Sequence, residues 1–435
     1  MAVLVCLCWL FHGVVFFVAL QLVSLASAAL TYFLMLRTFQ IYLPDVSARC
    51  GAFVLGMEAL MLIRYGMEVT LTLPLAMLLI YLLLRNGLPQ TFRQSASLGF
   101  VAALVILSRL DAGLLVLLLC AGVLLPPLRM GRSTIALIGF SCGVLPLLCL
   151  YFALNLHFFH LLTPVSGLAK QMKSSPGFSA ETWDSLLPTD RMRRLILLPE
   201  LLLIVAGSVA GILRLRQTAP TTSEVLRTRV LCVLLLFPLV HLSVLSLLSD
   251  WNVWPWYFYS ITLAAVAAYA LIVAQLPARS VMVCSVVYAS ILVGYAGVYA
   301  WKGPNSVTVY ESSLQVARYM DSHPGIYMMG DQAGMTAYLS HQPIIQTEGL
   351  VMDKQFLQRM RAGTPMRQVS QEYHAAYYAK LGDEYEGQCV HFAEPTNAGS
   401  QSPRMRGTIC HAPLAVFYRE SDHTPIRIFK AEWIR

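Results

Sequence analysis

Residues 256–300 read WYFYSITLAAVAAYALIVAQLPARSVMVCSVVYASILVGYAGVYA, and this stretch decides the fold. It contains two apolar runs, 256–276 and 279–300, and its one charged side chain is Arg279. An α-helix needs about 20 apolar residues to cross a bilayer, and inside the bilayer the backbone must satisfy its own hydrogen bonds. The stretch therefore predicts two membrane-spanning helices joined by a tight turn.

The same pattern extends toward the N-terminus. Eight further apolar runs precede this pair, so that about ten spans are expected. They lie at 13–36, 50–64, 69–85, 95–110, 112–127, 133–157, 195–213 and 229–249. The second to fifth runs are short, which leaves nine or ten crossings open. Apolar residues make up 57% of the 435 positions and charged residues 12%, a balance typical of proteins whose main solvent is lipid. We expect a polytopic α-helical membrane domain over residues 1–303.

From residue 304 the composition becomes polar. Short strand-like runs such as GIYMMG and QPIIQ alternate with amphipathic stretches such as SSLQVARYM, which predicts a small α/β domain over residues 304–435. Cys389 and Cys410 are the two cysteines of this region. They can form one disulfide if the domain lies in an oxidising compartment.

The arginines predict one orientation. If alternate loops are assigned to the cytoplasm beginning with 37–49, that side collects most of the arginines near span ends: Arg85, Arg93, Arg129, Arg132, Arg214, Arg216, Arg227, Arg229 and Arg279. This matches the positive-inside rule. The turns at 64–68, 109–111 and 250–256, the loop 158–194 and the C-terminal domain then share the opposite, extracytoplasmic face.

Two charged turns on that face are candidate sites. In RYGMEVTL, Glu68 follows Arg64 and precedes an apolar run, so its carboxylate either caps the next helix or belongs to a site. In SRLDAGLL, Arg109 and Asp111 lie at the junction of two apolar runs. They form either a structural ion cluster or a cradle for a phosphorylated lipid headgroup, with arginine as the phosphate ligand and a carboxylate as the base.

The segment NLHFFHLLTPVSGLAKQMK follows the sixth run. His157 and His160 are three residues apart, but their aromatic neighbours favour a membrane interface over a metal site. Lys170 is the better candidate, as a cation held near a phosphate. No metal site is predicted, and a divalent cation is neither indicated nor excluded.

Aromatic residues gather in SDWNVWPWYFY. Trp254, Trp256 and Tyr257 fit an aromatic belt at the membrane surface and equally a site that stacks sugar rings. Glu58, inside the second run, is a carboxylate at membrane depth; it is either functional or neutralised by a partner.

Other functional classes are poorly supported. The chain has no P-loop, no dinucleotide-binding glycine pattern, no H-E-x-x-H and no nucleophile elbow. Its net charge of +8 fits cytoplasmic loops and lipid phosphates, and no basic patch interleaved with aromatic residues indicates nucleic-acid binding.

In their order along the chain, RYGMEVTL, SRLDAGLL, LLTPVSGLAK and WPWYFY resemble the turns of the GT-C superfamily of membrane glycosyltransferases, especially bacterial mannosyl- and arabinofuranosyltransferase-like members. The stretch GDQAGMTAYLSHQPIIQTEGLVMDK is similar to a G-D-x-G…Y…G-L stretch of their extracytoplasmic domains. The resemblance covers about residues 50–360.

The resemblance implies a transferase that moves a sugar from a polyprenyl-phosphate donor to a lipid-linked or cell-envelope glycan. Its place would be the outer face of a bacterial inner (plasma) membrane, among membrane lipids and without a cofactor. Glu68 and Asp111 would be catalytic, and the substrate-binding residues would be Arg64, Arg109, Lys170, Trp254, Trp256 and Tyr257.

One departure from the family pattern leaves alternatives. The superfamily carries its principal catalytic carboxylate in a large loop after the first span, and no such loop occurs here. We therefore expect an N-terminally truncated chain. A non-catalytic relative of such transferases is the first alternative, and a polytopic transporter is the second. Transporters favour polar groups near the midplane, whereas here they gather at one surface.

Overall fold

The computed structural model describes residue 10 and residues 14–63, 68–124, 130–174, 177–179, 182, 191–216, 222–301, 305–382, 385–419 and 422–435. The chain forms two compact units. The first comprises Met1–Tyr151, Leu186–Val244 and Val253–Tyr295, and the second comprises Phe152–Ser185, Leu245–Asn252 and Ala296–Arg435.

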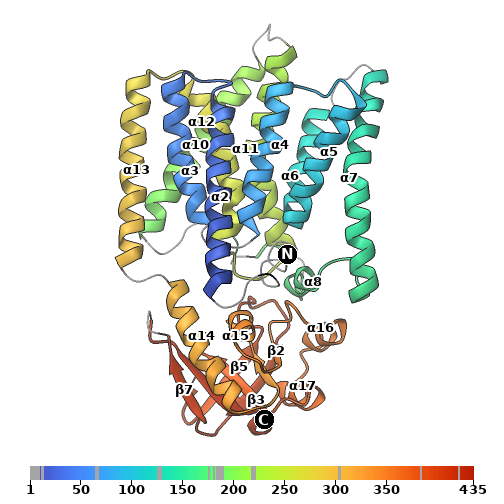
Figure 1. Ribbon diagram of the computed structural model, residues 1–435, viewed down its shortest axis with the longest axis vertical. Coiled ribbons are helices and arrows are strands. Elements are labelled where there is room, and N and C mark those ends of the chain that lie inside the picture. Colours follow the sequence, from blue (N-terminus) through green and yellow to red (C-terminus); the bar gives the residue numbers. More distant parts are fainter. Residues whose placement is uncertain are drawn as a thin grey trace. The chain divides into compact units, whose positions relative to one another are not determined.

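The first unit is built from helices that lie alongside one another (Figure 1). These helices are α2 (Val14–Phe39), α3 (Asp45–Ile63), α4 (Val69–Asn86), α5 (Phe92–Ser108), α6 (Gly113–Leu119), α7 (Met130–Phe159), α10 (Arg191–Leu215), α11 (Thr222–Leu248), α12 (Tyr259–Val273) and α13 (Ala278–Trp301), with the short turns η1 (Leu110–Ala112), η2 (Cys120–Leu124) and η3 (Pro255–Phe258).

Each predicted apolar run corresponds to a helix. Eight of the described helices are long and apolar enough to cross a membrane, whereas Phe92–Ser108 and Leu110–Val123 are shorter. A multi-pass membrane protein is thus indicated by length and composition, while the number of ten crossings stays a prediction.

Burial distinguishes the central helices of the unit from the peripheral ones. The apolar window of α12 is 78% buried, against 11% for α13. Alanines make this central position possible, because small side chains let neighbouring backbones approach. A Cβ at Gly207 of α10 would lie 2.6 Å from the Cα of Ala268 in α12. The outward valines of α13, such as Val283 and Val286, are exposed, as expected of a lipid-facing surface.

Glycines bring α5 and α7 into direct contact. A Cβ at Gly99 would lie 2.2 Å from the Phe140 carbonyl oxygen, and a Cβ at Gly143 would lie 2.1 Å from the Ala96 carbonyl oxygen. Gly139 and Gly143 have the G-x-x-x-G spacing of close helix pairs in membranes. Substituting either α7 glycine would push the two helices apart.

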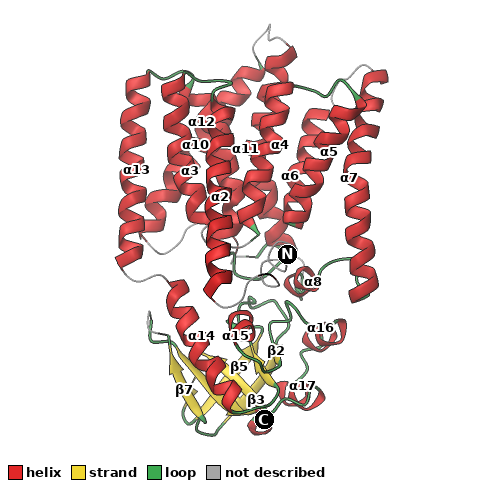
Figure 2. Cartoon of the chain, viewed as in Figure 1, coloured by secondary structure: helices red, strands yellow, loops and turns green. Residues whose placement is uncertain are grey.

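The second unit contains the predicted α/β fold (Figure 2). A five-stranded sheet has the order β2-β1-β3-β8-β7, in which β1 pairs in parallel with β2 and β3 and the remaining pairs are antiparallel. The strands are β1 (Tyr327–Met329), β2 (Ile344–Gln346), β3 (Tyr377–Leu381), β7 (Ala415–Tyr418) and β8 (Pro425–Lys430).

The smaller elements complete this unit. A three-stranded antiparallel sheet is formed by β4 (Tyr385–Glu386), β5 (Cys389–Glu394) and β6 (Met405–Ile409). The helices are α8 (Val165–Lys170), α14 (Asn305–Ser322), α15 (Ala333–Leu339), α16 (Lys354–Arg361) and α17 (Met366–Glu372). Side chains from α16, α17, β5 and β6 share one apolar core.

Asp250 ties distant segments of the second unit together. Its carboxylate accepts hydrogen bonds from the Ser179 hydroxyl at 3.1 Å and from the Gln401 backbone N–H at 2.6 Å. Its carbonyl oxygen accepts the Gly399 N–H at 2.6 Å. Because Asp250 is fully buried, these bonds replace the water that the carboxylate loses, and we assign it a structural role.

The predicted disulfide is present between Cys389 and Cys410 and joins β5 to the end of β6. It closes a loop between residues separated by 21 positions. A cross-link of this span restricts the unfolded chain enough to stabilise a domain by roughly 3 kcal/mol.

We expect the double variant Cys389→Ala, Cys410→Ala to lose roughly that stability and to melt at a lower temperature in detergent. Cys142→Ala is the matched control, since Cys142 is an exposed free thiol. Equal melting temperatures for the double variant and the control would contradict the assigned role.

Candidate functional site

Arg109 and Asp111 form a bidentate ion pair within the first unit. Arg109 Nε donates to Asp111 Oδ1 at 3.0 Å, and Nη2 donates to Oδ2 at 2.8 Å. The Arg109 side chain is only 7% exposed. A guanidinium this deeply buried requires such a partner, because an unpaired buried charge is strongly destabilising. The local turn brings the two side chains together, since α5 ends at Ser108 and Asp111 belongs to η1.

His241 of α11 extends this pair into a network. Its Nε2 lies 3.0 Å from Asp111 Oδ2, and its Nδ1 lies 3.0 Å from the Ser260 hydroxyl on α12. A carboxylate only accepts hydrogen bonds, so Nε2 carries the proton. Nδ1 and the Ser260 hydroxyl form the second hydrogen bond of the ring. The sequence provides little indication of His241, which is a lone histidine inside an apolar run.

Aromatic rings line the arginine. The Arg109 guanidinium lies 4.5 Å from the Tyr257 ring centroid and 5.4 Å from that of Tyr259, within cation–π range. Trp254 and Trp256, in the turn before α12, are stacked with centroids 5.4 Å apart. Trp254 is exposed. The two stacked indoles therefore offer an aromatic surface close in the chain to Tyr257, whose ring covers the Arg109 guanidinium.

Glu68 lies at the edge of this network. Its Oε2 is 3.9 Å from Arg109 Nη1, and 36% of its side chain is exposed. The capping interpretation is wrong, because the side chain makes no capping hydrogen bond to α4. The backbone carbonyl of Glu68 instead accepts the Thr72 hydroxyl at 3.0 Å. The Glu68 carboxylate is therefore partly exposed beside Arg109, while its backbone begins the helix.

The geometry separates the roles of the two predicted catalytic carboxylates. Both oxygens of Asp111 bind Arg109, and one also contacts His241. Asp111 is thus suited to holding these two side chains in place. Glu68 is the more exposed carboxylate and is better placed to exchange a proton with a ligand.

The structure does not join the other predicted site residues to this network. Arg64 is outside the described residues. Lys170 ends α8 in the second unit, so its sharing of a site with Glu68 stays a prediction. His157 and His160 are exposed. Across the described ranges, no three His, Cys, Asp or Glu side chains are grouped so as to hold a metal.

Within the second unit, Lys170 acts on Glu348, which follows β2. Burial, together with the charge of the Asp331 carboxylate, raises the pKa of Glu348 to about 7. A hydrogen bond from the Asn397 amide and the charge of Lys170 oppose that rise. Glu348 therefore changes its charge near neutral pH, unlike an ordinary glutamate.

This titration predicts a pH-dependent stability. The folded pKa of about 7 exceeds the ordinary 4.5, so the folded state binds the proton more tightly. The stabilisation is complete below pH 4.5 and is lost as the pH rises to about 7, by about 3 kcal/mol at most. We expect the melting temperature of Glu348→Gln in detergent to change less between pH 5 and 8 than that of the unaltered protein. An unchanged pH profile would contradict this assignment.

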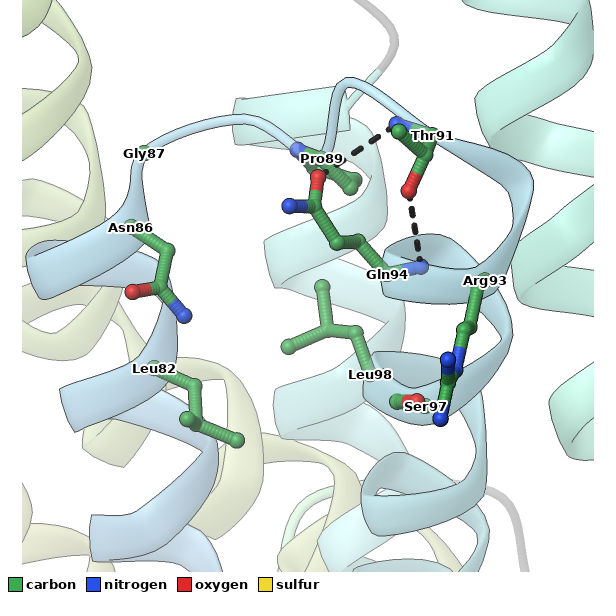
Figure 3. Close-up of a pocket in the computed structure, with 9 residues that line it drawn as sticks. All are labelled: Leu82, Asn86, Gly87, Pro89, Thr91, Arg93, Gln94, Ser97 and Leu98. Atoms are coloured by element: carbon green, nitrogen blue, oxygen red, sulfur yellow. Dashed lines mark hydrogen bonds between the residues drawn. The ribbon is translucent and has the colours of Figure 1, made fainter.

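A hollow of about 350 Å³ lies between the end of α4 and the start of α5 (Figure 3). These are the helix ends opposite to Glu68 and Arg109. Asn86, Arg93 and Gln94 supply polar atoms to it. The Thr91 hydroxyl and the Gln94 side chain form a reciprocal capping box, so donors of the first turn are already engaged. We therefore do not assign the site to this hollow.

No family model, curated protein or solved structure matches this chain. The resemblance to GT-C transferases thus depends on the motif residues themselves.

Proposed function

We propose that the protein is a membrane glycosyltransferase that moves a sugar from a polyprenyl-phosphate donor onto a lipid-linked or cell-envelope glycan. The observation that supports this most is the joining of three motifs in one network: Glu68, the Arg109–Asp111 pair and the aromatic turn before α12. A carboxylate, a guanidinium and exposed aromatic rings are the groups that such a reaction needs.

The proposed step begins at Glu68. Its carboxylate takes the proton of an acceptor hydroxyl. That oxygen attacks the anomeric carbon, and the bond from this carbon to the phosphate oxygen breaks. The polyprenyl phosphate leaves with the bonding electron pair, so no redox cofactor takes part.

Arg109 would stabilise the departing phosphate. Asp111 occupies its Nε and Nη2, which leaves Nη1, on the side of Glu68, to face a ligand. Arginine suits phosphate because its planar fork matches the geometry of the anion. A donor that is already oriented needs no reorganisation when charge develops on the leaving group.

The tryptophans would bind the apolar parts of the substrate. Exposed indole rings can stack on the faces of a sugar or contact an isoprenoid chain. Trp254 offers such a surface, and its parallel stacking on Trp256 holds it in one orientation.

An extracytoplasmic site is part of the proposal. The disulfide between Cys389 and Cys410 supports an oxidising compartment for the second unit. The distribution of arginines supports the same orientation, with a bacterial inner membrane as the host.

The test is a transfer assay. Membranes containing the protein receive radiolabelled polyprenyl-phosphate sugars, and label is followed into glycan. We expect labelled product that depends on the protein. Solute flux in proteoliposomes without any glycan product would refute the proposal in favour of a transporter.

A further inference from the structure

A second polar site lies inside the first unit, formed by two carboxyl groups. Glu58 on α3 and Glu200 on α10 are each more than nine-tenths buried. Their carboxyl groups lie close enough to act on each other. The Thr262 hydroxyl on α12 donates to Glu58 Oε1 at 2.9 Å. Three helices therefore meet at this pair.

The pair is separate from the network around Asp111. Ser260 contacts His241, while Thr262 contacts Glu58. Residues two apart on an α-helix point about 200° away from each other. The two polar sites thus occupy opposite faces of α12, and the Glu58–Glu200 pair is unused by the proposed transfer.

The burial of this pair favours a bound proton. An ionised carboxylate has lone pairs and no donor, so the two groups can form a hydrogen bond only when one of them is protonated. Within the described part of the chain, Glu58 Oε2 and Glu200 Oε1 have no donor partner. Two unpaired negative charges in an apolar interior would be strongly destabilising.

Within the described part of the chain, the groups found around the pair are neutral. Both carboxyls act on the phenol of Tyr288 on α13, and Thr262 contributes a neutral hydroxyl. Among the groups found to act on the pair in the described residues there is no lysine, arginine or histidine.

We propose that Glu58 and Glu200 form a proton-binding site that holds one shared proton at neutral pH and links α3 to α10. The site is independent of sugar transfer, since it involves neither Glu68 nor Arg109. Loss of the proton would leave two facing charges and force α3 and α10 apart.

Carbodiimide labelling tests the site on the full-length protein in membranes. Dicyclohexylcarbodiimide takes the proton of a carboxylic acid on its nitrogen, while the carboxylate oxygen adds to its central carbon. Acyl migration to nitrogen then gives a stable N-acylurea without a leaving group. Mass spectrometry at pH 7 is expected to find the adduct on Glu58 or Glu200. Exposed Asp45 is the control and is expected to stay unmodified.

Infrared spectroscopy gives a second readout that needs no reagent. At pH 7 we expect a C=O band of protonated carboxyl groups, to which Glu348 also contributes. The band should be weaker in the double variant Glu58→Gln, Glu200→Gln and unchanged in Glu68→Gln. A band of equal intensity in all three proteins, together with unlabelled Glu58 and Glu200, would overturn the proposal. Suppression of labelling by excess Na⁺ at constant pH would also overturn it, in favour of a metal-cation site.

Discussion

Asp111→Ala is expected to destabilise the protein by about 3–5 kcal/mol, because it leaves a buried guanidinium without its bidentate partner. The Arg109 side chain is 7% exposed and loses two hydrogen bonds in the variant. His241, which is fully buried, loses the acceptor of its Nε2 proton. Thermal melting of the purified protein in detergent measures the effect, and we expect a lower melting temperature together with loss of transfer activity.

The chain offers a matched control for this variant. Asp45 pairs with Arg49 at 2.6 Å, but both side chains are more than half exposed. An exposed pair of this kind contributes at most about 1 kcal/mol, so Asp45→Ala should melt close to the unaltered protein. If Asp111→Ala and Asp45→Ala melt alike, the Arg109 network does not stabilise the helical unit.

Glu68→Gln is expected to lower the rate of sugar transfer by about 10²–10⁴-fold, the contribution of a general base. The amide keeps the size of the side chain but cannot take the acceptor proton. Folding should be unaffected, because the carboxylate is partly exposed and makes no capping bond. Transfer from a radiolabelled polyprenyl-phosphate sugar measures the loss, and Glu68→Asp should retain more activity than Glu68→Gln.

A comparison with Asp111→Asn distinguishes the two carboxylates. Asparagine keeps an oxygen for Arg109 and is close in shape to aspartate, so this variant should retain more transfer than Glu68→Gln if it folds. If Asp111→Asn folds but is inactive while Glu68→Gln remains active, then Asp111 and not Glu68 is the general base.

The sequence predicted the helical architecture well because hydropathy is a local property. Boundaries were less accurate where polar residues belong to a helix. α3 begins at Asp45, earlier than its apolar run, since an acidic first turn complements the helix dipole. α5 begins at Phe92 after a Thr91–Gln94 capping box, a signal that was readable as T-x-x-Q.

The site was only partly predictable for a related reason. Arg109 and Asp111 are two positions apart, so their pairing was visible in the sequence. His241, the partner of Asp111, lies 130 positions away. Glu200, which acts on Glu58, likewise belongs to a helix distant in the chain. Apolar periodicity shows where helices are and which are amphipathic, but it does not show which helices are neighbours.

The most direct test of the account is the sidedness of its site. In a background without free cysteines, Glu68→Cys, Trp254→Cys and Lys170→Cys would be labelled by a membrane-impermeant maleimide in intact cells, with Asp45→Cys as the control for the opposite side. The account predicts labelling of the first three from outside and of Asp45→Cys only after the membrane is permeabilised. Labelling of Glu68→Cys and Trp254→Cys from different sides would contradict it.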